Sequence, residues 1–568
     1  MFTNLPKTPA ERLTWDWPQF EPLVRDLQKR PLTAHSLDEW LQDWSDWNEN
    51  LFELYNRLYV ATSIDTSDKA AQAAYTHYIE VIFQKSMQAE QGLKQKLLHS
   101  GLEPRGFETA LRNMRSEADL FRPANLPLLS EEQMLSNEFE KITSSQTVTW
   151  QGQERTVTQL RPVFQDSDRA RREAAWRLGL ERQLADRDAL NGLWVRFLGV
   201  RQQIAANAGR PDYRAYRWQQ LLRFDYTPDD CYRFHQTIEE GVVPAARRIY
   251  ERRRQRLGLD RLRPWDLEVD PLNHPPLQPY QTIPELIAKT SAIFQQVDPQ
   301  LGEYFQAMAR DGLLDLDNRK NKAPGGYCTD FAAERQPFIF MNGVGLHDDV
   351  QTLLHEGGHA FHVFETRPIR LTQQLHVSME FAEVASMSME LLAAPYLESR
   401  SGGFYSAQDA ARAQIQHLEN NILFWPYMAV VDAFQHWVYE NPSEAVDSCH
   451  CDAAWDRLWG RFMPGVDWSG LEVERMTGWH RKLHIFTLPF YYIEYGLAQL
   501  GAVQVWRNSL QDQPAAVRQY RQALALGGTV PLPQLYQAAG ARLAFDRETL
   551  AEAVDLMEGR ILELEERY

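Results

Sequence analysis

The stretch "TLLHEGGHAF", residues 352–361, decides how this chain is interpreted. Two histidines, His355 and His359, bracket a glutamate, Glu356, within a helical pattern. Two glycines lie between Glu356 and His359, although a glycine inside a helix costs about 1 kcal/mol relative to alanine. The pattern therefore raises the question of what two glycines do beside a His-Glu pair.

The spacing of the histidines indicates a metal site. Because His355 and His359 are four residues apart, both imidazoles project from one face of a helix, one turn apart. One Zn²⁺ can take both nitrogens there, and Glu356 lies beside them without having to bind the ion. This H-E-x-x-H arrangement is typical of metallopeptidases. Chance matches should occur in roughly a few per hundred chains of this size, so a third ligand is needed.

The predicted helix at 376–398 offers that ligand, with three acids at Glu380, Glu383 and Glu390. Glu383 lies in an apolar setting, which is costly for a carboxylate without a partner. A metal would supply the partner. Glu390 falls on the same face, where it either orients a ligand histidine or forms an ordinary salt bridge. The metzincin pattern is absent, because it requires a glycine at position 362 and a histidine at position 365, where this sequence has His362 and Glu365.

Several motifs together resemble a known family. "HEGGHAFH" at 355–362 is followed by "EFAEVASMSMELL" at 380–392, and "KAPGGYCTDF" and "PFIFMNG" precede them. With "WHRKLHIFTLPFYYIEYGLAQLGA" at 479–502, they resemble the M3 metallopeptidases, the thimet oligopeptidase and oligoendopeptidase F group, and most of all its bacterial branch. The resemblance implies a mainly α, two-lobed helical metallopeptidase, with a deep substrate channel and a small β-sheet beside the zinc helix.

The resemblance also implies roles for single residues. The metal ligands would be His355, His359 and Glu383, holding one Zn²⁺ per chain, with Glu356 as general base. Gly358 matches a family glycine that would let the Glu383 helix approach closely. Candidates for donating hydrogen bonds to the oxyanion are four residues late in the chain: His484, Tyr491, Tyr492 and Tyr495. Candidates for contacting substrate or supporting the metal ligands are His362, Glu390, Gly326 and Tyr327. Which tyrosine faces the zinc is left open.

Most of the remaining chain is predicted to be amphipathic helix. Apolar residues recur at spacings of three and four in 36–61, and the same periodicity runs through 64–118, 167–208, 227–257, 407–440 and 546–566. A hairpin is expected at 147–160, and two short strands are expected at 325–331 and 337–343. We expect an N-terminal helical lobe over 1–200 and a catalytic region over 201–568.

Composition limits the partners. The formal charge of -17 argues against nucleic acid as the main partner. Four cysteines in 568 residues are no disulfide framework, and "SCHCD" at 448–452 lacks a second Cys/His cluster to complete a zinc site. The longest apolar run is too short for a membrane span, and the N-terminus has no secretory signal pattern. We expect a cytoplasmic protein without a membrane partner, with a monomer favoured over an oligomer.

The predicted function is a zinc-dependent endopeptidase (an oligopeptidase) that hydrolyses internal bonds of short unstructured peptides. Such a peptide could add to the edge of the strand "PFIFMNG" through main-chain hydrogen bonds. One alternative is a zinc carboxypeptidase or dipeptidyl carboxypeptidase, which needs a fixed positive group such as Arg367, Arg370 or Arg481. A second alternative is an inactive helical peptide-binding protein.

Overall fold

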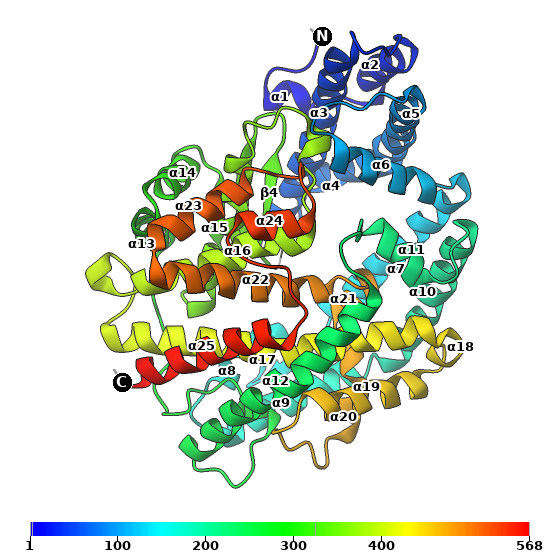
Figure 1. Ribbon diagram of the computed structural model, residues 1–568. Coiled ribbons are helices and arrows are strands. Elements are labelled where there is room, and N and C mark those ends of the chain that lie inside the picture. The colour runs from blue at the N-terminus through cyan, green and yellow to red at the C-terminus, as the bar shows by residue number, and fades with distance from the viewer. Residues whose placement is uncertain (1, 3, 324, 567–568) are drawn as a thin grey trace. The chain divides into compact units, whose positions relative to one another are not determined.

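The computed structural model describes residues 2, 4–323 and 325–566, and helices dominate it (Figure 1). Contacts within the chain divide it into two compact units. Unit 1 comprises residues 1–118, 277–413 and 498–543, and unit 2 comprises 119–276, 414–497 and 544–568. This division differs from the one expected near residue 200, which stays a prediction.

Unit 1 holds the three-stranded sheet and the helices that cover it. Its helices, wholly or for most of their length, are α1 (Pro9–Arg12), α2 (Trp17–Lys29), α3 (Leu37–Ile64), α4 (Lys69–His77), α5 (Gln84–Ser100), α6 (Glu108–Leu120), α13 (Ile283–Val297), α14 (Pro299–Arg310), α15 (His347–Glu365), α16 (Met379–Ala393), α22 (Tyr492–Gln511), α23 (Gln513–Leu524) and α24 (Leu532–Ala538). Its strands are β3 (Leu314–Asp317), β4 (Tyr327–Phe331) and β5 (Gln336–Gly343).

Unit 2 is helical apart from one hairpin. Its helices are α7 (Leu126–Ser144), α8 (Arg161–Phe164), α9 (Arg169–Leu184), α10 (Arg187–Asn207), α11 (Tyr213–Gln220), α12 (Pro228–Arg256), α17 (Ala407–Glu440, for most of its length), α18 (Pro442–Ala445), α19 (Ser448–Phe462), α20 (Glu472–Met476), α21 (Leu483–Thr487) and α25 (Arg547–Glu565). The hairpin consists of β1 (Thr147–Trp150) and β2 (Gln153–Thr156). The predicted helical stretches are therefore confirmed as helical, although 64–118 is divided into α4, α5 and α6, and 167–208 into α9 and α10.

The tryptophans of the helix predicted at 36–61 pack in the core of unit 1. α3 buries Trp40, Trp44 and Trp47, all at most 1% exposed, against α2 and α5. The indole of Trp40 donates to the carbonyl of Leu27 at 2.9 Å, and that of Trp47 donates to Phe20 at 3.2 Å. Burying a large ring while its polar atom keeps a partner is the arrangement that stabilises such cores.

The hairpin forms where the sequence predicts it. β1 and β2 pair antiparallel, and Gln151 and Gly152 between them have φ values of 52° and 79°. Positive φ at both central residues is the signature of a type I′ turn, whose twist matches that of the strands.

The sheet of unit 1 corrects one expectation. The strand order is β3-β5-β4, with β3 parallel and β4 antiparallel to β5. "PFIFMNG" is therefore the central strand, and the expectation that a peptide pairs with its edge is wrong. β3, which the sequence analysis missed, covers one side of β5. The strand that lies at the edge next to α15 is β4.

Among the helices of the described residues, none combines the length and the apolar character needed to cross a membrane.

Candidate metal centre and active site

α15 carries the two histidines, and its first turn is tied to the preceding loop. One carboxylate oxygen of Asp349 accepts the backbone amides of Val344, Gly345 and Leu346 at 2.8, 2.8 and 2.9 Å. The contact with Leu346 is that of a capping box, in which the N3 side chain accepts the N-cap amide, and the other two tie down the loop before the helix. One and two turns further on, the rings of His355 and His359 lie on one face with centroids 5.0 Å apart.

The two glycines of α15 make room for two different neighbours. A Cβ on Gly358 would lie 2.5 Å from the carbonyl oxygen of Ala385 and 2.6 Å from Cα of Ser386, so α16 can approach only because that atom is missing. A Cβ on Gly357 would lie 2.5 Å from Cζ of Phe294 on α13. The first contact agrees with the expectation for Gly358. The second explains Gly357, and no local signal could have shown it because Phe294 lies more than sixty residues upstream.

The close approach of α16 brings Glu383 to the histidines. Oε2 of Glu383 lies 3.3 Å from Nε2 of His355 and 3.7 Å from Nε2 of His359. The donor atoms of these three residues all lie within 4.8 Å of one another. Ser386 donates to the same carboxylate oxygen at 3.0 Å. Glu380, the other acid considered for this role, lies outside the group.

The geometry fits a zinc ion. Tetrahedral zinc bonds of about 2.0–2.2 Å place neighbouring ligand atoms roughly 3.3–3.6 Å apart, close to the two distances that Glu383 makes with the histidines. Nδ1 of His355 lies 2.7 Å from Oε1 of Glu390, which leaves Nε2 of the ring directed at Glu383. Glu390 therefore contacts a candidate ligand directly, so the orienting role considered for it stays a prediction with a defined contact.

The electrostatics of the group also favour a cation. Burial alone would lower the pKa of His355, but the hydrogen bonds that it donates to the carboxylates of Glu383 and Glu390 raise it well above its usual value. Burial would raise the pKa of Glu383, yet the two histidines lower it to about 2. Burial lowers the pKa of His359 to about 4, so this imidazole is neutral and can offer a lone pair. Two carboxylates and a neutral imidazole thus converge where positive charge is stabilised.

Glu356 is held between α15 and β4. Its side chain is buried, and its carboxylate accepts a hydrogen bond from the backbone amide of Cys328. Burial raises the pKa of Glu356 to about 7, partly opposed by the charge of His355. A carboxylate with a pKa near neutrality can both take and release a proton under physiological conditions.

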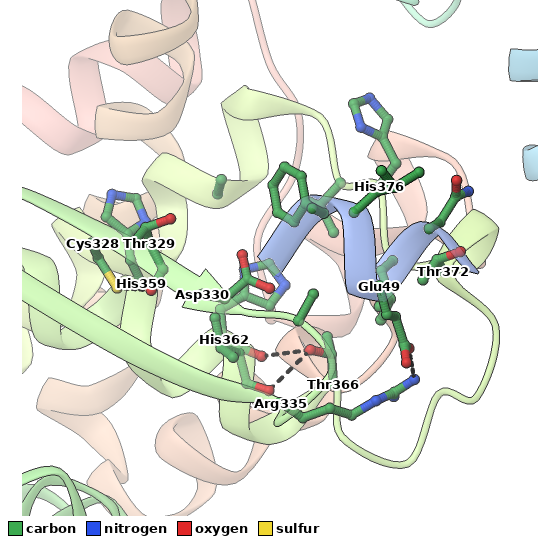
Figure 2. Close-up of a pocket in the computed structure, with 18 of the residues that line it drawn as sticks. Glu49, Cys328, Thr329, Asp330, Arg335, His359, His362, Thr366, Thr372 and His376 are labelled. Atoms are coloured by element: carbon green, nitrogen blue, oxygen red, sulfur yellow. Dashed lines mark hydrogen bonds and ion pairs between the residues drawn. The ribbon is translucent and has the colours of Figure 1, made fainter. Parts of the chain in front are cut away.

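A pocket of about 710 Å³ opens next to the histidines (Figure 2). Its walls are β4, α3, α5, and the C-terminal half of α15 with the loop that follows it. Figure 2 labels these residues of the pocket lining: Glu49, Cys328, Thr329, Asp330, Arg335, His359, His362, Thr366, Thr372 and His376. The pocket lies entirely within unit 1, and it adjoins His359 of the candidate metal group.

The pocket has charges of both signs, and most of them are paired. Arg335 pairs with Glu49, as the dashed line in Figure 2 shows, whereas Asp330 takes part in no ion pair among the described residues. Burial raises the pKa of Asp330 to about 6 and that of Glu49 to about 7. The sequence analysis missed these residues, because contacts between α3 and β4 span almost three hundred positions.

The remaining candidates of unit 1 lie near this pocket or at the start of β4. His362 lines the pocket, and its buried Nε2 has no hydrogen-bond partner among the described residues. Burial lowers the pKa of His362 to about 4. Gly326 lies against α15, where a Cβ would be 3.2 Å from Thr352. The ring of Tyr327 stacks on Phe340 with centroids 4.9 Å apart.

The late His and Tyr candidates cluster with one another in unit 2. The ring of His484 lies 5.8, 5.0 and 5.9 Å from those of Tyr491, Tyr492 and Tyr495. The turn that joins α21 to α22 is pinned at Phe490, whose amide donates to Gln435 at 3.0 Å. The metal group belongs to unit 1, so a catalytic role for these four residues stays a prediction.

The cysteines of "SCHCD" do not form a metal group within the described residues. Cys449 is exposed, whereas the buried thiol of Cys451 lies 3.2 Å from the carbonyl oxygen of Ala445.

Two curated relatives are named as oligopeptidases. The oligoendopeptidase F homolog of Mycoplasma pneumoniae is 28% identical over 310 residues, which are 51% of this chain and 48% of that protein. The oligopeptidase PepF of Bacillus subtilis is 22% identical over 280 residues, 47% of this chain and 39% of its own length. The alignments thus span about half or less of these curated relatives.

A solved structure matches over nearly the whole chain. PZ peptidase A with inhibitor 2 superposes with a TM-score of 0.88 at 28% identity, covering 99% of this chain and 98% of that one. Residues 163–555 match the profile of peptidase family M3, and this range contains α15, α16 and the sheet. The chain therefore belongs to peptidase family M3.

Proposed function

We propose that this chain is a zinc-dependent endopeptidase that hydrolyses internal bonds of short unstructured peptides. The observation that carries the proposal is the convergence of His355, His359 and Glu383 within 4.8 Å of one another, directly beside Glu356. Membership of peptidase family M3 supports it. The proposal includes one zinc ion per chain, and an acidic, cytoplasmic protein that acts as a monomer without nucleic-acid or membrane partners.

The three residues would hold the metal through Nε2 of each histidine and a carboxylate oxygen of Glu383. When bound, zinc supplies a Lewis acid that polarises the scissile carbonyl and lowers the pKa of a water molecule towards neutrality. Glu390 keeps a proton on Nδ1 of His355, so that Nε2 presents its lone pair.

Glu356 would act as the general base. Its carboxylate takes a proton from the attacking water and then passes it to the nitrogen of the leaving amine. Its pKa of about 7 suits both transfers, and the amide of Cys328 fixes the carboxylate between α15 and β4. His484 and the tyrosines Tyr491, Tyr492 and Tyr495 remain the candidates for donating hydrogen bonds to the oxyanion.

The substrate backbone would lie along β4. Among the described strands, β4 pairs only with β5. On its other edge, the amide of Cys328 donates to Glu356 and the carbonyl of Asp330 accepts from Asn56 at 2.8 Å. A peptide would pair with the main-chain groups that remain on this edge, which read an extended backbone and not a sequence. The pocket beside His359 and His362 would then take a side chain or the end of that peptide. Because Asp330 lies in its wall without an ion-pair partner among the described residues, this pocket favours a cationic group.

The exopeptidase alternative needs a fixed positive group for a terminal carboxylate. Arg367 lines the pocket opposite in charge to Asp330, while Arg335 pairs with Glu49 and Glu90 pairs with Lys94. Arg370 donates to Gln42 at 3.0 Å. The exopeptidase therefore stays the alternative, and peptides with blocked ends discriminate between the two.

The test is hydrolysis of an internally quenched peptide of about ten residues with both ends blocked. The wild type, Glu356→Gln and the matched control Glu365→Gln are compared, with zinc content measured on each. Glu365 lies on the same helix, where it pairs with Arg521 at 2.7 Å. We expect Glu356→Gln to keep its zinc and to lose activity by roughly 100- to 10,000-fold, while Glu365→Gln stays active.

The other outcomes discriminate between the alternatives. Zinc without cleavage of blocked peptides, but with cleavage of free-ended ones, would replace the proposal by the exopeptidase. If the wild type neither binds zinc nor cleaves peptides, the inactive peptide-binding protein would be the remaining alternative.

A further inference from the structure

Unit 2 contains a second cluster of side chains of the types that ligate metals. Cys231 and His235 lie one turn apart on α12, and Asp432 and His436 lie one turn apart on α17. All four are at most 2% exposed. The donor atoms of Cys231, Asp432 and His436 lie within 4.8 Å of one another.

The two helices are packed antiparallel, so that these pairs face each other. Nε2 of His235 lies 2.8 Å from Oδ2 of Asp432, and further along the pair Arg252 lies 3.5 Å from Glu419. Two pairs of residues at i and i+4 on facing helices are a common way to build a metal site in the core of a helical bundle.

The group has a polar atom that the protein itself does not satisfy. Oδ1 of Asp432 is buried and has no hydrogen-bond partner among the described residues. Nε2 of His436 is directed at Asp432, 3.4 Å from Oδ2. Buried polar atoms without partners are rare in folded proteins and call for a ligand or a water.

The surroundings exclude most water. The ring of His436 lies 4.8 Å from that of Tyr232 and 5.1 Å from that of Phe490, and Phe462 flanks His235. Burial lowers the pKa of His436 in spite of the neighbouring carboxylate, whereas the two histidines keep the pKa of Asp432 below its usual value. A buried carboxylate inside an aromatic shell, with imidazoles as neighbours, would be stabilised further by a bound cation.

We propose that Cys231, Asp432 and His436 form a second metal site, which takes Zn²⁺ or a similar thiophilic divalent ion. A thiolate and a carboxylate together neutralise the two charges of such an ion, and thiolate, imidazole and carboxylate are its usual ligands. His235 orients Asp432 through their 2.8 Å contact. Since the group is buried and has no open face, its role is to hold α12 to α17, not to catalyse.

One neighbouring contact has to change when the ion binds. Nη1 of Arg214 lies 3.2 Å from Nδ1 of His436 and 2.6 Å from Oε1 of Glu440. Coordination through Nε2 leaves the ring proton on Nδ1, so Arg214 loses this contact and keeps its pair with Glu440 and its 2.9 Å hydrogen bond to the hydroxyl of Tyr232. Binding also releases the proton of the Cys231 thiol, so the affinity falls at acidic pH.

The experiment counts metal ions and identifies a sulfur ligand. The full-length chain is stripped with a chelator and reloaded with zinc, and zinc per chain is measured by elemental analysis. We expect two ions per wild-type chain, and one in Cys231→Ala and in Asp432→Asn. Cys451→Ala, which removes another buried thiol of unit 2, is the matched control and should keep two.

Cobalt gives a second readout, independent of catalysis. The His355, His359 and Glu383 group has no sulfur ligand, so a sulfur-to-cobalt charge-transfer band in the reloaded chain can come only from a cysteine site. The band should disappear in Cys231→Ala and persist in Cys451→Ala and in Cys328→Ala, since Cys328 is the thiol next to Glu356.

Both wild-type measurements can overturn the proposal even if a variant fails to fold. One zinc per wild-type chain and no sulfur band would mean that the four residues form only a buried hydrogen-bonded cluster. A band that persists in Cys231→Ala would assign the sulfur ligand elsewhere. Neither result would affect the proposed peptidase, which depends on the group in unit 1.

Discussion

Nδ1 of His355 lies 2.7 Å from Oε1 of Glu390, and the same ring directs Nε2 at Glu383. One imidazole is thus held from both sides by two acids of α16, seven residues apart on one face. The contact fixes both the orientation of the ring and the nitrogen that carries the proton.

We expect Glu390→Gln to weaken zinc binding by about 10- to 100-fold and to leave substantial activity at saturating zinc. The reason is that the amide still reaches His355 but no longer stabilises its proton by charge. Activity measured against a series of buffered zinc concentrations gives the apparent affinity. An unchanged zinc dependence would mean that Glu390 serves only the packing of α16.

The glycines of α15 should respond differently to added methyl groups. Gly358→Ala meets backbone atoms of Ala385 and Ser386 that cannot move aside, so it should displace Glu383 and lower both zinc content and stability, by about 1–3 kcal/mol or more. Gly357→Ala meets the ring of Phe294, a side chain. Gly357→Ala should therefore lose stability, and combining it with Phe294→Leu should restore part of that stability.

Chemical denaturation and zinc content measure these effects. Gly199→Ala on α10 is the matched control, because a Cβ there has nothing within 4 Å; it should be neutral or stabilise the chain by about 0.4–1 kcal/mol. If Gly358→Ala behaved like Gly199→Ala, the close approach of α15 and α16 would be wrong.

The buried carboxyl group of Asp330 should make stability depend on pH. Burial raises its folded pKa to about 6, above its usual value of 3.8, so the folded state resists ionising this group. Its contribution to stability is present below about pH 4 and is lost as the pH rises to about 6. Relative to wild type, the free energy of unfolding of Asp330→Asn should increase by roughly 1–3 kcal/mol across this window and then remain level.

Denaturation curves of both proteins between pH 4 and pH 8 check this prediction. Asp317→Asn on β3, whose side chain is 51% exposed, makes the same chemical change in the same sheet and should show no such trend. A stability difference between Asp330→Asn and wild type that did not vary with pH would show that Asp330 gains a partner in solution.

The charge of the pocket predicts a preference among substrates. End-blocked peptides that carry one lysine, scanned through the positions around the cleaved bond, should be cleaved about 3- to 10-fold better than norleucine peptides at one position. The ratio of the two kcat/KM values should fall towards one in Asp330→Asn and stay unchanged in Asp317→Asn. A second series with free and acetylated N-termini separates recognition of a side chain from recognition of the terminal ammonium. Equal rates in every wild-type comparison would remove the cationic preference and leave the peptidase itself untouched.

Periodicity along the chain was enough to predict much of the local structure of this protein. The spacing of His355 and His359, the helices at 227–257 and 407–440, and the hairpin turn at Gln151 and Gly152 all follow from local geometry, since residues within a few positions meet in any helix or hairpin. Glu383 could be selected because a carboxylate in an apolar stretch needs a partner.

Contacts between distant segments were decided only by the tertiary structure. The sequence shows neither that Phe294 fills the place beside Gly357, nor that β5 is the central strand, nor that Asp330 faces a pocket walled by α3. Cys231 and Asp432 are two hundred residues apart, and nothing local marks them as neighbours. Such contacts depend on how whole helices pack, because the close packing of an interior is a property of all its surfaces together and not of any one segment.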